Sequence, residues 1–262
     1  LDSRHPQRVR FIADPAIDAG RRDFTINALY FDPVKKEITD FTGGIGDMKK
    51  RRLRFVGSAS KRIQEDALRL MRAVRFAAAL DFELSSKDRS VIKKNVKLIG
   101  KISPERIKQE LDKIMLSSHR SRGLEMLFKL GLLHYIAPEL QRLNQTPQSK
   151  NFHSEGNVWA HTLLALQLVE RDAGIRTLYG LLFHDIGKAQ TIKRTRKDGQ
   201  PHTSFHNHPE VGRVQTLQVL RHLRFSNAEI ENITWYVKNH LVPFELPKMR
   251  LSKQMAWCLD GR

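Results

Sequence analysis

Residues 178–189 read LYGLLFHDIGKA and place the pair His184–Asp185 at the end of an apolar run. The run predicts a buried helix, and a buried imidazole beside a buried carboxylate needs hydrogen-bond partners or a metal ion. On a helix the two side chains would point about 100° apart, so both could bind one ion only if that ion lay near the backbone at one edge of the helix. The pair is therefore the first candidate metal site in the sequence.

Further histidines lie on either side of this pair, on stretches with helical periodicity. They are His161 in NVWAHTLLAL, His208 in FHNHPEVG and His240 in ITWYVKNHL. Imidazole nitrogens together with one carboxylate suit Zn, Fe, Ni or Mn, so the five residues could converge on one divalent transition metal ion. The alternative for each histidine is a satisfied core or surface residue. Three others have polar or arginine-rich neighbours and are expected to be solvated: His202, His206 and His222.

In order and context, the four segments resemble the HD domain of metal-dependent phosphohydrolases over about residues 150–245. The resemblance implies a helical domain whose five residues hold a divalent transition metal such as Ni or Mn. It also implies hydrolysis of phosphomonoesters or cyclic phosphates. Such domains usually end with an aspartate on a later helix. Asp260, in WCLDGR, is the carboxylate nearest the end of the chain, and we do not expect it to fill that position.

A second pattern lies upstream, in RRDFTINAL (21–29). Three apolar residues, Phe24, Ile26 and Ala28, alternate with polar ones, which predicts a strand that follows a basic turn. Two guanidinium groups and the Asn27 amide at one strand edge would suit a triphosphate and a ribose. The segment is therefore a candidate nucleotide-binding strand.

The third informative segment is EDALRLMRAVRF (65–76). Its apolar residues recur at helical spacing from Ile63 to Ala77, so we predict one amphipathic helix. Asp66 and Arg69 would then be neighbours, and together they could pair with the edge of a nucleobase. The alternative, which this helix alone favours, is an intrahelical salt bridge worth about 0.2–0.5 kcal/mol.

Taken with ITDFTGGIGDMKKRRLRFV (38–56), these two segments resemble the family of tRNA CCA-adding enzymes and bacterial poly(A) polymerases over about residues 7–135. The resemblance implies a role in nucleotide binding for six residues: Arg22, Asp23 and Asn27 at the ribose and triphosphate, Asp66 and Arg69 in the selection of C or A, and Arg72 at the base or phosphate. It also implies tRNA, CTP and ATP as partners.

The reaction implied by this resemblance is attack of an RNA 3′-hydroxyl on the α-phosphate of CTP or ATP, with release of pyrophosphate. Family members hold two Mg ions for it with an Asp-x-Asp pair after a Gly-Gly or Gly-Ser turn. No segment before Arg21 has that form, so no catalytic residue is assigned, and we expect an incomplete form that binds tRNA without extending it. Three alternatives stay open: a poly(A) polymerase, which shares the EDxxR helix, an HD phosphohydrolase, and an RNA-binding remnant without catalysis.

The composition favours a polyanionic partner. The chain has 46 Lys and Arg against 28 Asp and Glu, a formal charge of +18 and a pI of about 10.3. Basic runs are spread along it, at KKRRLR (49–54), VIKKNVK (91–97) and KRTRK (193–197). One cysteine, Cys258, argues against a disulfide scaffold and favours a reducing compartment. Since neither an apolar run of about 18 residues nor a secretory leader is seen, we expect a cytoplasmic protein without a membrane span.

We predict an α+β chain that is mostly α. A hairpin of Ala28–Phe31 and Glu37–Phe41 should flank the turn DPVKK, and a helix should begin at Pro104 with Ser103 as its cap. The predicted units are the C-terminal part of a β-containing nucleotidyltransferase head (1–57), a helical nucleotide-selecting and RNA-binding region (58–140), a polar linker (141–151) and a helical HD domain (152–262).

Overall fold

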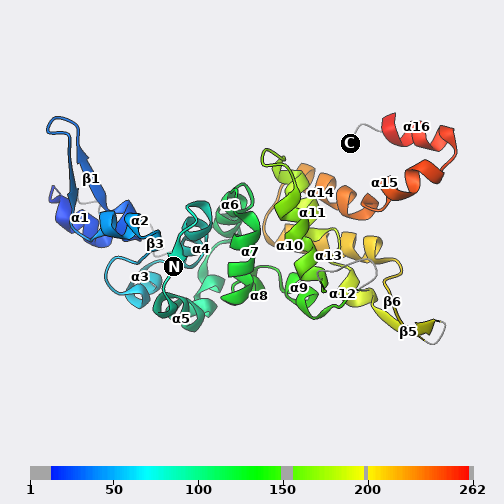
Figure 1. The fold of residues 1–262 in the computed structure, drawn as a ribbon, viewed down its shortest axis with the longest axis horizontal. Coiled ribbons are helices and arrows are strands. Elements are labelled where there is room, and N and C mark those ends of the chain that lie inside the picture. Colours follow the sequence, from blue (N-terminus) through cyan, green and yellow to red (C-terminus); the bar gives the residue numbers. More distant parts are fainter. Residues whose placement is uncertain (1–12, 149–155, 198–199, 260–262) are drawn as a thin grey trace.

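The computed structural model describes residues 13–148, 156–197 and 200–259. Figure 1 shows an elongated chain, with the N-terminal elements at one end, a central group of helices, and the histidine-bearing helices at the other end. Helices make up 65% of the structure and strands 9%, which confirms the mostly helical α+β class. No helix in the described part has the length and apolarity needed to span a bilayer.

The N-terminal elements form a small head with the predicted hairpin. Strand β1 pairs antiparallel with β2, with Leu29 opposite Asp40 and Asp32 opposite Glu37. The elements are α1 (Pro15–Arg21), η1 (Thr25–Asn27), β1 (Leu29–Asp32), β2 (Glu37–Asp40), α2 (Gly44–Lys49) and β3 (Arg52–Leu53).

The predicted strand over RRDFTINAL is wrong. Its first arginine ends α1, Phe24 makes a single bridge with Phe55, and residues 25–27 form the 3-10 helix η1. The Asn27 side chain accepts a hydrogen bond from the Phe24 N–H (3.1 Å), and the Thr25 hydroxyl donates to the buried Asp47 carboxylate (2.7 Å). A polar side chain that bonds to nearby backbone, as that of Asn27 does, competes with a strand ladder.

The predicted helix over residues 63–77 is two helices, α3 (Ala59–Glu65) and α4 (Arg69–Ala79). They separate at Asp66, whose backbone is extended and whose carboxylate accepts the Leu68 N–H at 3.0 Å. Asp66 and Arg69 are therefore not neighbours on one helix, as the intrahelical reading required. The apolar stripe was predicted correctly, since Ile63, Leu70, Val74 and Ala77 are fully buried.

The central helices begin with a short parallel pair of β3 and β4 (Glu83–Leu84). Ser103 is the residue before α6, as predicted, although its side chain makes no capping hydrogen bond. Gly131, at φ +80°, separates α7 from α8. The other elements are α5 (Ser86–Asn95), η2 (Val96–Lys101), α6 (Pro104–Met115), α7 (Arg120–Lys129), α8 (Leu133–Ile136), α9 (Pro138–Gln141) and η3 (Arg142–Gln145).

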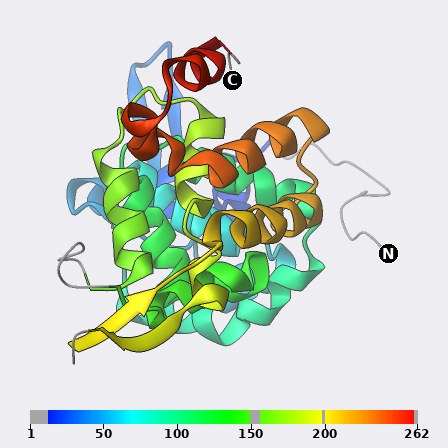
Figure 2. The same cartoon turned by 90° about the vertical axis from the view of Figure 1, so that its right-hand side faces the viewer.

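The C-terminal region is helical, as predicted, with one exception. KRTRK forms strand β5 (Lys193–Lys197), which pairs antiparallel with β6 (Gln200–Ser204), so His202 lies in a strand and not in a loop. Figure 2 shows this hairpin and α16 projecting from the body. The helices are α10 (Val158–Leu168), α11 (Ile175–Phe183), α12 (Lys188–Thr191), α13 (His208–His222), α14 (Asn227–Asn239), α15 (Val242–Glu245), η4 (Leu246–Lys248) and α16 (Leu251–Leu259).

One hydrophobic core extends from the head through the central helices into the C-terminal region. Polar contacts also cross the boundary: the Tyr179 hydroxyl donates to Asp112 (2.7 Å) and the Trp159 indole to Glu125 (2.9 Å). The buried Arg120 donates to the carbonyl of Arg171 at 3.0 Å. Of the segment predicted as linker, residues 142–145 form η3 with a buried Leu143, and residues 149–151 lie outside the described ranges.

Candidate functional site

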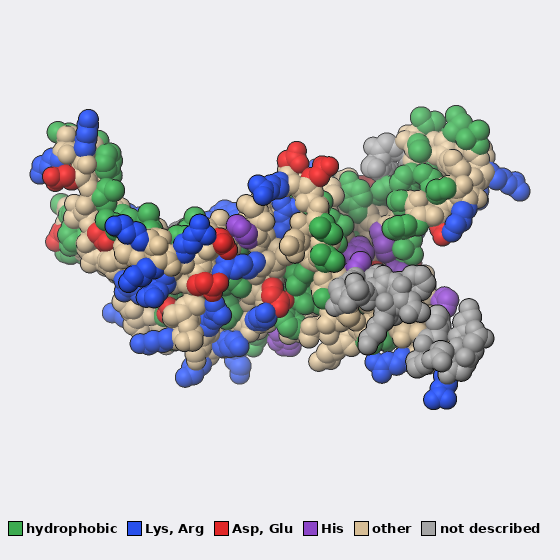
Figure 3. All heavy atoms as spheres, viewed as in Figure 1, with side chains coloured by type: hydrophobic (Ala, Val, Ile, Leu, Met, Phe, Trp, Pro, Cys, Tyr) green, Lys and Arg blue, Asp and Glu red, His purple; other side chains and the backbone are tan. Residues whose placement is uncertain are grey.

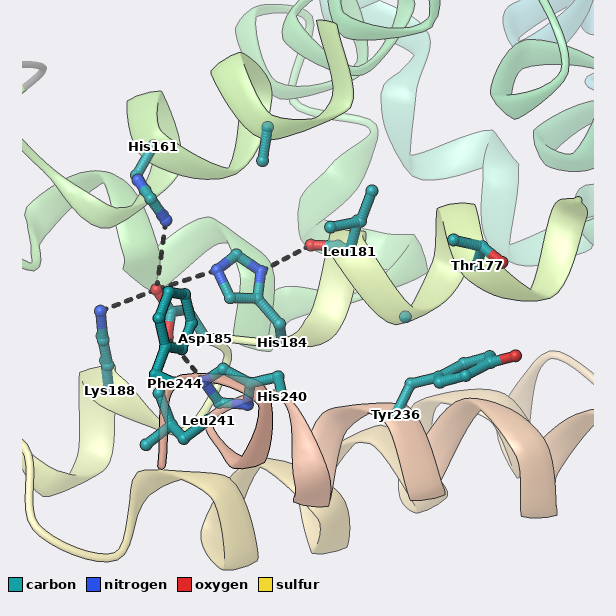
Figure 4. A pocket seen from close by; sticks show the side chains of 12 residues that line it. His161, Thr177, Leu181, His184, Asp185, Lys188, Tyr236, His240, Leu241 and Phe244 are labelled. Carbon is teal, nitrogen blue, oxygen red and sulfur yellow. Dashed lines mark hydrogen bonds and ion pairs between the residues drawn. The ribbon is translucent and has the colours of Figure 1, made fainter. Parts of the chain in front are cut away.

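The five residues predicted as metal ligands converge on one point. His161 lies in α10, His184 and Asp185 in the turn directly after α11, His208 at the first residue of α13, and His240 just after α14. From the carboxylate of Asp185, the imidazole Nε2 atoms of residues 184, 208, 240 and 161 lie at 3.1, 3.3, 3.7 and 3.9 Å. Figure 4 shows Asp185 with three of these imidazoles, those of residues 161, 184 and 240. Four of the five thus lie at or beyond helix ends and not within helices, which lets adjacent His184 and Asp185 face the same point.

The backbone fixes the orientation of three of these imidazoles. In each, Nδ1 lies against the carbonyl oxygen three residues earlier, at 2.7 Å for His184 and 2.8 Å for His208 and His240. A carbonyl only accepts, so Nδ1 carries the hydrogen, and Nε2 of a neutral ring then presents a lone pair. These lone pairs face the Asp185 carboxylate, which is itself an acceptor. The arrangement therefore requires a cation.

Two of the histidines also indicate a cation, independently of the Asp185 carboxylate. His208 Nε2 and His240 Nε2 lie 3.2 Å apart, and each ring uses Nδ1 to donate to the backbone. Two lone pairs at this distance repel unless a proton or metal ion is shared between them. Burial lowers the pKa of His240 to about 4, which disfavours the protonated ring. The donor set therefore fits a divalent metal ion.

Asp185 divides the five residues into two groups that share it. Oδ2 faces His161 and His184, whereas Oδ1 faces His208 and His240. Burial raises the pKa of Asp185, but the close contacts with His184 and His208 and the charge of Lys188 outweigh this and keep the pKa far below its usual range. The carboxylate is thus ionised and can face an ion on either side.

The sequence interpretation did not include Lys188. Its buried ammonium lies 2.7 Å from Asp185 Oδ2 and 2.8 Å from the Gln148 side-chain oxygen. The spacing of Lys188 from Asp185 could have revealed this contact, because residues three positions apart lie on the same side of a helical turn. Lys188 balances part of the negative charge and holds the carboxylate in place.

A cavity of about 550 Å³ opens beside the cluster. The rest of its lining is mostly apolar: Tyr236 and Leu181 lie away from the carboxylate, and Phe244 lies close to it (Figure 4). Such a cavity can take a phosphate at the metal and a flat or apolar group further along. The lining residues are His161, Ala165, Thr177, Gly180, Leu181, His184, Asp185, Lys188, Tyr236, His240, Leu241 and Phe244.

Four of the six predicted nucleotide-binding residues line a second cavity, of about 370 Å³, in the head. Arg22, Asp23 and Asn27 come from the RRDFTIN segment and Arg72 from α4. Two further residues line it: Arg21, the other guanidinium group expected to suit a triphosphate, and Asp18, which was not predicted. Asp18 precedes Arg21 and Arg22 by three and four positions, which is the spacing of helical neighbours.

Ion pairs fill much of this cavity's wall. Asp18 accepts from Arg22 (2.6 Å), from Arg21 (2.5 Å) and from the Tyr30 hydroxyl. The Tyr30 hydrogen bond, followed by those from Arg22 and Arg21, holds the pKa of Asp18 well below its usual range. The two arginines predicted to face a triphosphate are therefore held by an acid that a triphosphate would have to displace or share.

Arg69 does not appear among the residues that line this cavity, because the protein holds it from behind. Its Nε donates to Asp23 (2.6 Å), Nη1 to Glu65 (3.0 Å) and to the Arg62 carbonyl (2.7 Å), and Nη2 to the Arg21 carbonyl (3.2 Å). Four of its roughly five N–H groups are thus engaged. In this conformation Arg69 has little left to offer a base.

The other two predicted residues have partners at the same junction. Asp23 also accepts from Arg72 Nε, so that one carboxylate joins α4 to the RRDFTIN segment through two arginines. Asp66 lies 3.5 Å from Arg106 of α6. The structure therefore brings all six predicted residues to one junction of the head with α3, α4 and α6, four of them at the cavity itself.

Of the histidines expected to be solvated, His206 and His222 are exposed. The side chain of His202 and the whole of Asp260 lie outside what the structure describes.

Three family models match the chain in consecutive order. They are the poly A polymerase head domain over residues 1–54, the probable RNA and SrmB-binding site of polymerase A over 81–143, and the HD domain over 158–257. The last of these covers all five residues of the metal cluster. The first covers the RRDFTIN segment.

Relatives with curated names agree with this order. The CCA-adding enzyme of Lactococcus lactis subsp. lactis (strain IL1403) is 42% identical over 175 residues, which are 64% of this chain and 44% of the relative. That of Pediococcus pentosaceus (strain ATCC 25745) is 33% identical over 229 residues, 83% of this chain and 57% of the relative. The chain thus spans about half the length of the curated relatives it matches.

A solved structure gives the same result. The Bacillus stearothermophilus CCA-adding enzyme in complex with CTP superposes with a TM-score of 0.66 at 25% identity, over 94% of this chain and 51% of that one. Because the domain order, the named relatives and the fold agree, the chain belongs to the family of CCA-adding enzymes and poly(A) polymerases.

Proposed function

We propose that the chain serves tRNA 3′-terminal CCA addition, as a CTP/ATP:tRNA nucleotidyltransferase. The observation that carries this is the cavity that unites Arg22, Asp23 and Asn27 with Arg72. Its guanidinium and amide groups suit a triphosphate and a ribose, and the α3–α4 junction behind it carries Asp66 and Arg69. The similar Bacillus stearothermophilus enzyme was solved with CTP.

In this proposal the reaction joins an RNA 3′-oxygen to the α-phosphorus of CTP or ATP and breaks the bond to pyrophosphate. Two Mg ions would stabilise the attacking and leaving oxygens. The residues of this chain would bind and orient the nucleotide. Arg21 and Arg22 would exchange Asp18 for the triphosphate, and Arg69 would exchange a protein acceptor for the base.

The base preference tests this role and separates it from addition of A alone. We expect the chain to bind CTP and ATP with similar affinity and UTP and GTP more weakly, as measured by calorimetric titration. A strong preference for ATP over CTP would favour a poly(A) polymerase. Equal, weak binding of all four would leave an RNA-binding protein without nucleotide selection.

Binding of tRNA is expected from the charge of +18. Each phosphate that the protein neutralises should add roughly 0.7 to 0.9 to the slope of log K against log salt. Titration of labelled tRNA from low to high salt measures this slope, and a flat profile would contradict the proposal. A tRNA substrate, together with a lone cysteine, favours the cytoplasm as the compartment.

We infer a second function for the C-terminal cluster, which is binding of a divalent transition metal, Ni or Mn for example, and hydrolysis of phosphate esters. The facing lone pairs of three imidazoles and Asp185 support the ion. When bound, the ion would polarise a phosphate and activate water. The residues of the chain would hold it, exclude bulk water and place the apolar part of a substrate against Tyr236 and Phe244.

Elemental analysis before and after His184→Ala with Asp185→Ala tests the metal. We expect one equivalent of metal in the unaltered protein and close to none in the variant. His222→Ala, at an exposed histidine, is the matched control. Assays with a cyclic phosphate and with p-nitrophenyl phosphate, with added Ni, Mn or Mg, test hydrolysis. Metal content that is equally near zero in both proteins after reconstitution would contradict the site.

A further inference from the structure

The hairpin of β5 and β6 has no packing role that explains its sequence. Of the ten residues in its two strands, Pro201 is the only one without a polar side chain, so the hairpin has no apolar face to bury. Lys193, Arg194 and Arg196 are exposed, and they form no ion pair with the residues that the structure describes. A two-stranded hairpin without a core is only marginally stable by itself. Its basic side chains therefore face solvent or a ligand.

Several arginines of the head, unlike those of the hairpin, are paired with carboxylates that the structure describes. Arg22, Arg54 and Arg69 are each held by a carboxylate at 2.6 to 2.8 Å. In the hairpin, four of the five residues of β5 are basic, and neither strand contains an acid. Figure 3 shows Lys and Arg side chains projecting at this end of the molecule, beside the grey residues. Unneutralised cations on one projecting element are suited to an extended polyanion.

The foot of the hairpin is part of the metal site. β5 begins five positions after Lys188, and β6 ends four positions before His208. Between them, Phe205 supplies the carbonyl that orients the His208 ring (2.8 Å), and its own ring lies 5.3 Å from the Lys188 ammonium. A strand of five residues extends roughly 16 Å, so the basic side chains lead from solvent to the cluster.

We propose that this hairpin is an RNA-binding arm, which holds the phosphodiester backbone of an RNA beside the C-terminal metal cluster. It contacts phosphates through Lys193, Arg194 and Arg196, and it reads no sequence, because such contacts position an RNA without specifying bases. This surface is separate from the nucleotide cavity of the head. Its binding does not depend on hydrolysis, so metal-free protein serves for the test.

The test compares binding of labelled tRNA by Arg194→Ala with Arg196→Ala and by a matched control. Arg250→Ala with Lys253→Ala removes the same charge from an exposed surface around α16. Loss of two phosphate contacts should lower the slope of log K against log salt by about 1.4 to 1.8 and weaken binding roughly 25- to 60-fold at 0.1 M salt. The control should change binding much less.

Equal losses in the two variants would mean that only net charge matters, and an unchanged affinity would mean that no RNA lies on the hairpin; either result overturns the proposal. Titration of anionic phospholipid vesicles provides a further check. If the hairpin variant lost vesicle binding and kept tRNA binding, the partner would be a membrane surface. A photocrosslinker at Thr195→Cys in a Cys258→Ser background should label bound RNA, and absence of labelling would contradict the arm.

Discussion

The C-terminal cavity and the nucleotide cavity of the head hold their polar groups by different means. In the C-terminal cluster, backbone carbonyls fix three imidazoles, and Asp185, Lys188 and His208 are buried. In the head, side chains hold side chains, and Arg22 and Arg72 remain 49% and 29% exposed. The acceptor atoms of the first site are arranged in advance for a cation. The second is neutralised by its own acids and must exchange partners to take a ligand.

The largest effect should follow from Lys188→Met, which leaves the buried Asp185 without its nearest positive charge. Removal of one partner from a buried pair costs about 3–5 kcal/mol, so metal-free protein should lose stability by that order in urea unfolding. Added Ni or Mn should restore much of the loss, because the ion replaces the ammonium charge. Lys238→Met, at an exposed lysine, is the control. A stable metal-free variant would show that the cluster does not need a cation.

Arg69→Ala should have the next largest effect on stability. The sequence alone placed Arg69 off the apolar stripe and predicted a cost well under about 1 kcal/mol. The structure shows it donating to Asp23, Glu65 and two carbonyls, so we now expect about 2–3 kcal/mol. Asp66→Ala, which loses the Leu68 N–H contact, should cost about 1 kcal/mol.

Both variants should also relax discrimination of CTP and ATP from UTP and GTP, which the same calorimetric titration measures. Loss of stability with unaltered nucleotide selection in both would leave these residues as purely structural.

The smallest effect should come from Glu65→Gln, which weakens one of the contacts that hold Arg69. If a base must compete for this guanidinium, release of Glu65 should tighten CTP and ATP binding up to about fivefold. Glu83→Gln, another exposed carboxylate paired with arginines, is the control. Weaker nucleotide binding in Glu65→Gln would mean that Glu65 positions Arg69 for the base and does not withhold it.

The sequence predicted the metal cluster well because residue type carried the signal. Imidazoles and a carboxylate in helical segments have few other reasons to be buried together. Their exact placement did not follow, because the positions of the helix ends depend on local hydrogen bonds. Lys188 was missed for a related reason, since a lysine is expected at the surface unless a buried acid is known to face it.

The head was harder to predict because its side chains bond to the nearby backbone. Alternation in RRDFTINAL suggested a strand, but the Asn27 side chain accepts a hydrogen bond from the Phe24 N–H instead. Continuous periodicity suggested one helix across Asp66, whose carboxylate instead bonds to Leu68. The hairpin carried a signal that was overlooked: Asp198-Gly199 is a dipeptide favoured in two-residue hairpin turns.

The core that α10 and α11 share with α6 and α7 places both proposed activities under one folding equilibrium. Even if the metal chemistry were no longer needed, α10 and α11 could not be deleted without cost. Loss of Tyr179 and Trp159 would expose the surfaces of α6 and α7 that they cover. Selection for the function proposed for the head and central helices would then preserve the histidine-bearing helices for their structural role. Ligand residues would drift first, while the buried apolar positions around them would persist.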